Sequence, residues 1–200
     1  MPLITPTEAR TYLPQTSGDE TLISTLIDEA GEMMAIYCGY ARPSASTAPT
    51  MLSTSYTLFL DSVGRSFVRL PCAPITAVSA LYDDPDRQYG AATAIGSTYR
   101  EIAGDAADTI ELLPTYGIFS GTELAPTRRA IKVSVTAGFA TADAELKAIC
   151  GWLVKHLFEQ RRRGQQAGAE DNGAASPRIP AALRSRLGRY MLPAAFGGAS

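Results

Sequence analysis

The side chains that most often carry catalysis are sparse in this chain of 200 residues. His156 is the only histidine, which excludes two-histidine metal sites and most proton relays. It falls within a strongly apolar helical pattern, where a structural role is favoured over catalysis. Cys38, Cys72 and Cys150 form no Cys-x-x-Cys pair and are interpreted as reduced, partly buried thiols.

Carboxylates are the second group that could do chemistry. The segment 83–86, Asp-Asp-Pro-Asp, lacks the Gly and the bidentate Glu of a calcium-binding loop, so a sharp turn is the favoured interpretation. Glu101 and Asp105 form an acid pair in a strand-rich region, where such groups are usually solvated. Nucleotide-binding glycine loops and the Gly-x-Ser-x-Gly elbow are absent from the sequence. The sequence therefore predicts a protein that is not an enzyme, with no catalytic residues, no cofactor and no metal.

The stretch 141–163, TADAELKAICGWLVKHLFEQRRR, is predicted to be the helix around which the chain is organised. Thr141 is placed to cap its start, and three arginines close its last turn, where the helix dipole favours cations. Its apolar residues recur at spacings of three and four, as on one helix face: Leu146, Ile149, Cys150, Leu153, Val154, Leu157 and Phe158. So broad an apolar face requires a packing partner.

The N-terminal region is predicted to supply that partner as two helices. Thr5-Pro6-Thr7-Glu8 has the capping-box arrangement and starts a short helix over 5–13. A wide apolar stripe then runs through 19–39 and ends near Gly39.

The middle of the chain, about 50–139, is predicted to be an inserted, mostly antiparallel β region. Short runs rich in β-branched and aromatic residues are separated there by Gly, Pro and Asp turns. The six predicted strands are Tyr56–Leu60, Ser66–Leu70, Ile75–Tyr82, Ser97–Ile102, Thr109–Leu113 and Ala130–Thr136. Alternation is strict in the last strand, which predicts one buried and one wet face.

The C-terminal region divides into a polar linker, 164–178, and a segment over 179–200 that contains a short amphipathic basic helix. Such a helix is marginal alone, and a partner's surface is favoured over the chain's own because of the linker. The predicted fold class is thus α+β: a helical bundle, in which the N-terminal helices pack on the long helix, with an inserted β region and a tethered C-terminal helix. Residues 1–163 form the main domain of this prediction.

Charge is distributed unevenly along the chain, although the net charge is only -2. Residues 1–40 carry six acids against Arg10, whereas residues 141–200 carry nine Lys or Arg against five acids. This gradient suits contact between neighbouring copies, a basic tail on an acidic or phosphate surface, or simply solvated faces. No apolar run approaches the ~18 residues needed to cross a bilayer, and the N-terminus lacks a signal-peptide pattern.

Three ordered motifs resemble the head-tail connector (adaptor) proteins of long-tailed bacteriophages and of phage-derived gene transfer agents. The first is ITPTEARTYLPQTSGDETLISTLIDEAGEMMAIYCGY, with its D-E-x-L-I-x-x-L-I-x-x-A helix and Tyr-Cys-Gly end. The second is FVRLPCAPITAVSALYDD, with an L-P-x-x-P-I turn, and the third is the Gly-Phe that precedes the long helix. Together they cover about the first 160 residues. The strand-rich middle departs from the smallest, all-helical members of the family.

The resemblance implies a structural ring component without enzymatic activity. Family members assemble as rings, commonly of twelve copies, beneath the portal after DNA is packaged, and join the filled capsid to stopper or tail-completion proteins. The implied partners are the portal, those proteins, other copies of the chain and, non-specifically, DNA in the channel, with no membrane. The implied location is the head-tail interface of a virion or phage-like particle made in the host cytoplasm.

Position in the chain suggests which residues make these contacts. The predicted portal-binding residues are Arg184, Leu187, Arg189 and Tyr190. The predicted channel or neighbour contacts are Arg161, Arg162 and Arg163.

Two other hypotheses remain open. A DNA-binding or DNA-packaging accessory protein would use the arginine-rich C-terminal region and bind duplex DNA with steep salt dependence. A pI near 5.5, and the lack of aromatic residues interleaved with the basic ones, argue against it. An enzyme of the cell wall or of carbohydrate metabolism would use loop carboxylates, and replacing one acid would abolish its activity without unfolding the chain.

Overall fold

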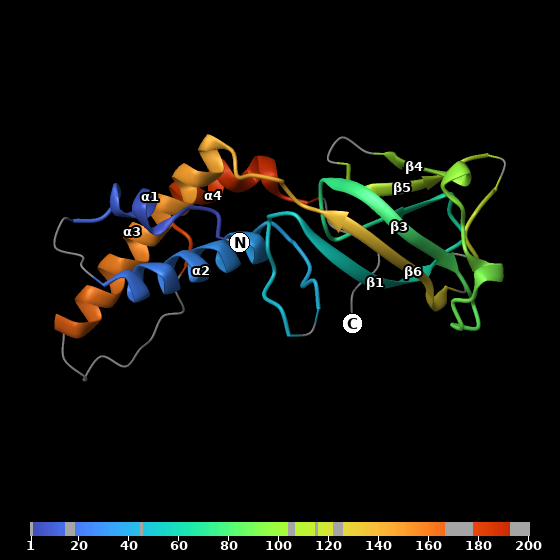
Figure 1. Cartoon of the computed structure of the whole chain (residues 1–200), viewed down its shortest axis with the longest axis horizontal. Coiled ribbons are helices and arrows are strands. Elements are labelled where there is room, and N and C mark those ends of the chain that lie inside the picture. Colours follow the sequence, from blue (N-terminus) through green and yellow to red (C-terminus); the bar gives the residue numbers. More distant parts are fainter. Residues whose placement is uncertain are drawn as a thin grey trace. The chain divides into compact units, whose positions relative to one another are not determined.

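A computed structural model describes residues 2–14, 19–44, 46–103, 107–114, 116–121, 126–166 and 178–192. The chain divides into two compact units. We call residues 1–38 with 140–191 the helical unit, and residues 39–139 with 192–200 the β unit. Figure 1 shows the elements of each unit.

The helical unit begins with α1 (Pro6–Arg10) and α2 (Glu20–Tyr37). Thr5 Oγ1 accepts a hydrogen bond from Glu8 N at 3.2 Å, and Thr5 N donates to Glu8 Oε2 at 2.8 Å. These two bonds are the capping box that the sequence predicts. Asp19 caps α2 by accepting hydrogen bonds from two backbone N–H groups of its first turn.

The C-terminal half of the helical unit contains α3 (Ala144–Gln166), α4 (Ala181–Leu187) and a 3₁₀ turn, η3 (Gly188–Tyr190). Asp143 stands at the cap position of α3, and its Oδ1 accepts a hydrogen bond from Leu146 N at 2.7 Å. The predicted cap was Thr141, but a carboxylate directly before the first turn satisfies the free N–H groups.

Packing of α2 against α3 buries the apolar faces that the sequence predicts. At most 2% of each contributing side chain is exposed: Ile23, Leu26, Ile27, Ala30, Met34, Leu146, Ile149, Cys150, Leu153, Val154 and Leu157. Arg161 Nη2 of α3 pairs with Glu29 Oε2 of α2 at 2.7 Å. Within the residues described, no helix is long and apolar enough to span a bilayer.

The β unit contains two three-stranded sheets in which all neighbouring strands are antiparallel. The first has the order β1 (Thr54–Ser62), β6 (Thr127–Ala137), β3 (Ile75–Asp83). The second has the order β2 (Phe67–Arg69), β5 (Thr109–Leu112), β4 (Arg100–Ala103). Two short 3₁₀ turns, η1 (Ala91–Thr93) and η2 (Ser97–Tyr99), precede β4.

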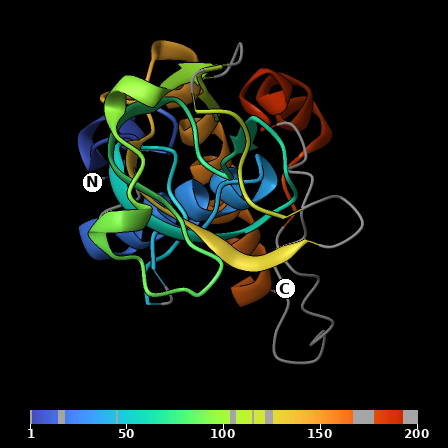
Figure 2. The same ribbon diagram turned by 90° about the vertical axis from the view of Figure 1, so that its right-hand side faces the viewer.

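The central strand β6 shows why these residues form a sheet with an inner and an outer face. Ile131, Val133 and Val135 are buried, whereas Lys132 and Ser134 between them are partly exposed. Each buried residue faces an apolar residue across the strand pair, as in the Leu58 to Val133 and Tyr56 to Val135 pairs. Figure 2 shows the strands of the β unit curving around a common interior.

The interior of the β unit shows that the predicted fold class was wrong. The β unit has a hydrophobic core of its own, whose residues lie between positions 56 and 137 and come from both sheets and from the loops that connect the strands. The prediction of a helical bundle with an inserted β region was wrong, because the six strands form a two-sheet core. The helices do not form a bundle around a long helix: α1 has five residues and α4 has seven. The runs rich in β-branched and aromatic residues do form strands, but a linear pattern does not show how those strands pack on one another.

Gly138, the residue after β6, has a backbone conformation that other residues rarely adopt. Its φ is +109°, and an added Cβ would lie 2.5 Å from Leu52 O. We expect Gly138→Ala to lower the free energy of unfolding by about 2–3 kcal/mol, because both the dihedral and the clash oppose alanine. Thermal denaturation with hydrogen exchange of the β6 amides measures this change.

Gly90→Ala is the matched control, since Gly90 has a φ of -78° and no atom within 4 Å of an added Cβ. Its effect should stay within about 0.5 kcal/mol. Equal effects of the two substitutions would contradict the steric explanation.

Glu8 ties α1 to α3, because its Oε1 lies 2.7 Å from Lys147 Nζ. The Lys147 ammonium and then the Thr5 N–H lower the pKa of Glu8 from 4.5 to about 2. The folded pKa lies below the unfolded value, so this stabilisation is complete above pH 4.5 and is lost as pH falls toward 2. We expect Glu8→Gln to cost up to about 1 kcal/mol at pH 7, because the half-exposed pair is screened, and nothing near pH 2.

Urea denaturation followed by far-UV circular dichroism at several pH values measures this difference. Glu20→Gln removes the more exposed Arg10 to Glu20 pair and should have little effect at any pH. A Glu8→Gln difference that persists unchanged at pH 2 would show that charge is not its cause.

Candidate protein-interaction site

The side chains best suited to catalysis or metal binding, the three cysteines and the histidine, take part in packing or hydrogen bonding within the helices and sheets. Burial raises the pKa of Cys38, Cys72 and Cys150 to about 12, so these thiols stay protonated and unreactive at neutral pH. His156 Nε2 lies 2.9 Å from Gln160 Nε2, one turn along α3. These positions agree with the structural interpretation of the sequence.

The acidic segment 83–86 is a turn whose carboxylates hold the surrounding loops. Asp84 accepts hydrogen bonds from Asp86 N at 2.9 Å and Tyr89 N at 2.6 Å. Burial opposes its ionisation, but these hydrogen bonds outweigh burial and hold the pKa of Asp84 below its ordinary value. Asp83 accepts two hydrogen bonds from Ser120, both at 2.7 Å. Among the described residues, no cluster of acids, histidines or cysteines could hold a metal ion.

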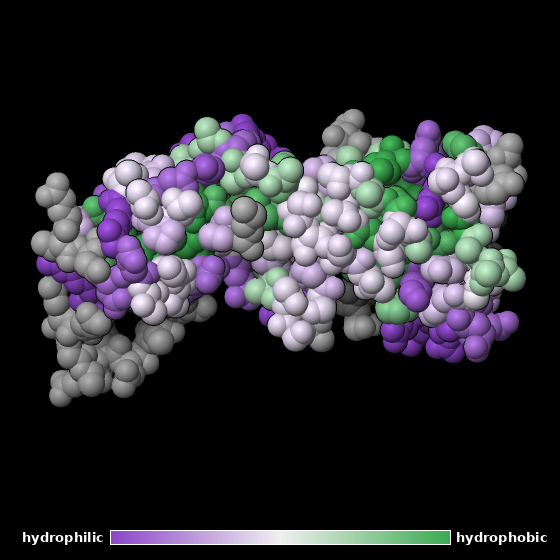
Figure 3. All heavy atoms as spheres, viewed as in Figure 1, coloured by the Kyte–Doolittle hydropathy of each residue, from purple (hydrophilic) through white to green (hydrophobic). Residues whose placement is uncertain are grey.

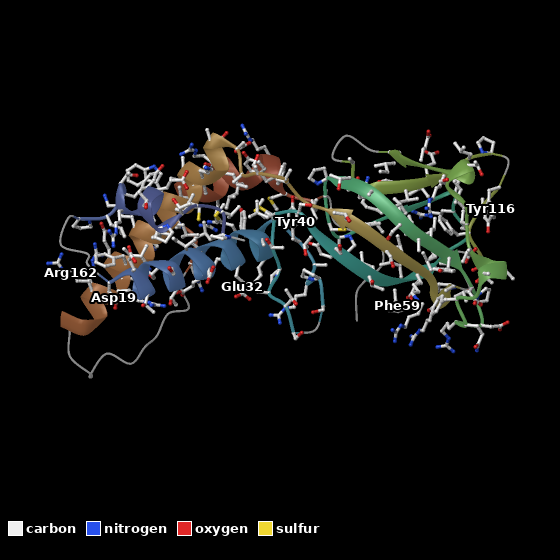
Figure 4. The ribbon with its side chains drawn as sticks, viewed as in Figure 1. Asp19, Glu32, Tyr40, Phe59, Tyr116 and Arg162 are labelled. Carbon is white, nitrogen blue, oxygen red and sulfur yellow. The ribbon has the colours of Figure 1, made fainter. Side chains whose placement is uncertain are left out.

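The predicted acid pair of Glu101 and Asp105 cannot be placed, because Asp105 lies outside the described residues. Glu101 stands opposite Glu111 on the neighbouring strand. Among the three predicted contact arginines, Arg161 pairs with Glu29 within the chain, whereas Arg162 and Arg163 are exposed. Figure 4 shows Arg162 near the C-terminal end of α3.

The C-terminal segment Ile179–Tyr190 packs on the chain's own helical unit. Leu183, Leu187 and Tyr190 are buried, and Leu187 O lies 3.9 Å from Cys38 Sγ at the end of α2. Figure 1 shows α4 beside α3. The sequence favoured a partner's surface, but the apolar face of α4 is covered within this chain. Two of the four predicted portal contacts, Leu187 and Tyr190, are therefore occupied by internal packing.

An ionic cluster fixes this segment to the start of α3. Tyr190 Oη donates to the Asp143 carboxylate, whose oxygens lie 2.8 and 2.7 Å away. Arg189 Nη2 lies 3.1 Å from Asp143 Oδ2 and Nη1 pairs with Glu145. Arg186 Nε lies 3.4 Å from Glu145 Oε1. One helix start is thus held by three side chains that come from more than forty residues further along the sequence.

The pKa values of this cluster follow from the same contacts. The Leu146 N–H first, and then Tyr190 and Arg189, hold the pKa of Asp143 below its ordinary value, against a smaller opposing effect of burial. Burial and then Asp143 raise the pKa of Tyr190 to about 12. The carboxylate therefore stays ionised and the phenol stays protonated, which is the pairing that the hydrogen bond needs. Arg184, the remaining predicted contact, is exposed.

A second group, which the sequence did not reveal, lies on the outer face of the first sheet. We call Phe59, Tyr82, Tyr89, Arg129 and Lys132 the cation–aromatic cluster. Arg129 Cζ lies 4.8 Å from the Phe59 ring centre, and Lys132 Nζ lies 5.5 and 5.3 Å from those of Tyr82 and Tyr89. The cluster unites β1, β3, β6 and the turn after β3, so no sequence window contains it.

Comparison with known proteins finds similarity of fold. Neither a protein-family model nor a curated protein sequence matches this chain. One similar solved chain comes from the neck of an empty gene transfer agent (GTA) particle computed with C6 symmetry, with TM-score 0.59, 18% identity, and coverage of 99% of this chain and 94% of that chain. Another comes from the virion of a native GTA particle, with TM-score 0.61, 17% identity, and coverage of 98% and 93%. The fold of this chain thus resembles chains of GTA particles, which agrees with the resemblance found in the sequence.

Anchoring of the C-terminal segment can be tested by weakening its buried contacts. We expect Leu187→Ala to create a cavity and cost about 2–4 kcal/mol of docking energy. Amides 181–190 should then exchange hydrogen at least about tenfold faster, as mass spectrometry would measure. Tyr190→Phe, which removes the Asp143 hydrogen bond, should have a smaller effect in the same direction.

Arg184→Ala is the matched control in the same segment, because Arg184 is exposed. It should leave the exchange rates near those of the wild type. Unchanged exchange in Leu187→Ala would contradict docking of the segment on the helical unit.

Proposed function

We propose that this protein is a non-enzymatic structural component of the neck of a phage-like particle, where it acts as a head-tail connector. The observation that carries this proposal is the fold similarity to chains of GTA neck and virion particles over nearly the whole chain. Coverage of 98–99% of this chain includes both the helical and the β unit.

The internal chemistry of the chain supports a structural role. The described carboxylates of the 83–86 turn hold loops, and the three thiols are buried and protonated. Side chains that could contact other proteins, such as Arg162, Arg163 and Arg184, are exposed at the surface instead. On the face drawn in Figure 3, hydrophilic side chains and side chains of intermediate hydropathy cover most of the described surface, with smaller apolar areas between them.

In this proposal copies of the chain form a ring beneath the portal and bind the stopper or tail-completion proteins on its other side. A contact of one surface with a different surface on the next copy closes into a ring when the rotation per copy is right. Of the proposed portal contacts, Arg184 and Arg189 are exposed in the docked C-terminal segment, and Arg189 is already paired with Asp143 and Glu145. Arg162 and Arg163 are proposed to meet a neighbouring copy or DNA in the channel, since Arg161 is already paired.

The first test is affinity purification of the tagged full chain from cells that make the particle. We expect portal and tail-completion proteins in the eluate by mass spectrometry, and rings by negative-stain microscopy. Recovery of duplex DNA that is lost steeply with added salt, without neck proteins, would favour the DNA-binding alternative instead. Recovery of a metabolic partner without a ring would contradict the proposal.

Charge reversal sharpens this test. Arg184→Glu should reduce recovery of the portal by about three- to tenfold, because one exposed ionic contact becomes repulsive. Arg178→Glu makes the same charge change near the start of the segment, outside the proposed contact, and should leave recovery unchanged. If both variants recover the same amount of portal protein, Arg184 does not take part in the portal contact.

A further inference from the structure

The cation–aromatic cluster presents a basic surface with an apolar centre on the outer face of the first sheet. Phe59 is 40% exposed, and the Arg129 guanidinium lies against its ring. Lys132 of β6 stands between Phe59 of β1 and Tyr82 of β3 in the strand register. Figure 4 shows Phe59 with the nitrogen atoms of basic side chains beside it. The cluster therefore places two cations around one exposed ring.

Arg129 is held in this cluster through its backbone. Its N–H donates to Asp61 Oδ1 at 2.8 Å, and its carbonyl oxygen accepts from Tyr89 Oη at 2.5 Å. The φ angles of Arg129 and Tyr89 are +52° and +50°, in the left-handed region that residues other than glycine rarely adopt. Such a conformation is kept where the surrounding structure holds a residue in one geometry. The position of the arginine is thus set before any partner binds.

The two cations of the cluster have no acidic partner within the chain. In the part of the chain that the structure describes, no carboxylate forms an ion pair with Arg129 or Lys132. Their contacts with aromatic rings order the charged groups without neutralising them. The cluster is therefore a basic surface that an anionic group can still bind.

A row of opposite charge crosses the second sheet. Phe67 of β2, Glu111 of β5 and Glu101 of β4 are direct neighbours in the strand register. The adjacent row contains Val68 and Ile110 of the hydrophobic core. Because successive side chains of a strand point to opposite faces, the first row lies on the outer face of the sheet. We call Phe67, Glu101 and Glu111 the glutamate row.

The two carboxylates of the glutamate row face each other across neighbouring strands. Like charges in direct opposition are destabilising, yet neither carboxylate forms an ion pair with any described cation. Arg69 lies on the same face of the sheet, but it pairs with Asp108 at 3.2 Å. Arg65 lies over the Phe67 ring, 5.7 Å from its centre. The chain itself thus leaves this acidic pair without a counter-charge.

The two surfaces lie on opposite sides of the β unit. The outer faces of two sheets that share one interior point away from each other. Figure 1 shows β4 and β5 on one side of the unit and β1 on the other. The cluster and the glutamate row of one copy therefore cannot meet, whereas those of two copies can.

We propose that the cation–aromatic cluster of one copy binds the glutamate row of a second copy. In this contact Phe59 packs against Phe67, each of which is 40% exposed, and the two glutamates face Arg129 and Lys132. Opposite charges then surround an apolar centre. Because the two surfaces differ, each added copy leaves one of them open for the next copy until a ring closes. This inference rests on the proposed function, in which copies assemble side by side.

Nucleic acid fits these observations less well than a second copy. The two tyrosine rings of the cluster are half-buried with Lys132 against them, so they are not open platforms for stacking bases. The net charge of -2 gives no general attraction to a polyanion. A polyanion on the cluster also leaves the glutamate row without a cation, whereas a second copy satisfies both surfaces.

Cysteine cross-linking of the full chain tests the contact directly. The native cysteines are buried, so introduced surface cysteines report on their own. Glu101→Cys and Arg129→Cys each keep the second charge of their surface. We expect a mixture of the two variants to form a mixed disulfide dimer in clear excess over either homodimer. A chain with both substitutions should form a ladder of covalent oligomers.

Oxidation is carried out on the free chain and on the rings recovered by affinity purification. The mixed dimer, or the ladder of the doubly substituted chain, supports the contact in either preparation. Absence of both products from both preparations, or equal yields of the mixed dimer and the two homodimers, would overturn the proposal.

Charge exchange gives an independent measure by sedimentation velocity and by the yield of rings. Glu101→Arg and Arg129→Asp should each weaken self-association by about three- to tenfold, because an attractive pair becomes repulsive. The double variant Glu101→Arg, Arg129→Asp should regain most of the lost association, since the charges are only exchanged. Asp28→Arg makes the same charge change as Glu101→Arg at an exposed position of α2 and should associate like the wild type. Failure of the exchanged pair to restore association would contradict the contact.

Thermal denaturation of Glu101→Arg separates the contact from an effect on the fold. This substitution places opposite charges across β4 and β5, so the melting temperature of the single copy should rise while self-association falls. A lower melting temperature together with weaker association would place the effect in the fold of one copy and contradict this explanation.

Three further outcomes separate this inference from the proposed function. Recovery of neck proteins and rings without any cross-link would overturn the contact and leave the structural role intact. A mixed cross-link in a chain that recovers no neck proteins would support the contact and contradict the proposed function. Duplex DNA binding that Arg129→Asp abolishes, without a mixed cross-link, would assign the cluster to phosphates instead.

Discussion

Burial of the apolar face of α3 is the interaction on which the helical unit depends. α2 covers this face along much of its length, and Glu8 and Glu29 add ion pairs from the N-terminal helices. α4 then packs beside α3, with Leu187 completely buried. The polar contacts are individually weak at exposed positions, so the packed apolar surface supplies most of the stability and the ions fix the register.

The same principle explains why the C-terminal segment is anchored in this chain. A seven-residue helix has little stability of its own and must bury its apolar side. The start of α3 offers both an apolar surface and the carboxylates of Asp143 and Glu145, which receive Arg189 and Tyr190. A segment held in this way presents Arg184 and conceals Leu187, so its surface differs from that of a free amphipathic helix.

The β unit follows a separate rule, because its stability comes from two sheets that share one interior. β6 lies between β1 and β3, and its alternation sends every second side chain into that core. The side chains at alternate positions point outward, so charged and aromatic residues of three strands lie next to one another on the outer face. The cation–aromatic cluster is a product of this arrangement.

The sequence alone determined the local elements, since capping, period and β-branching act between near neighbours. The Thr5 to Glu8 capping box, a helix over 19–39, the apolar face of α3 and the six strands could all be predicted from it. The order of motifs indicated the connector resemblance. Only the tertiary structure decided that the strands form a two-sheet core instead of a bundle insertion, and that Asp143 holds Tyr190. It also brought Phe59, Tyr82 and Lys132 together. These features depend on contacts between residues tens of positions apart, and the linear pattern does not specify which buried face meets which.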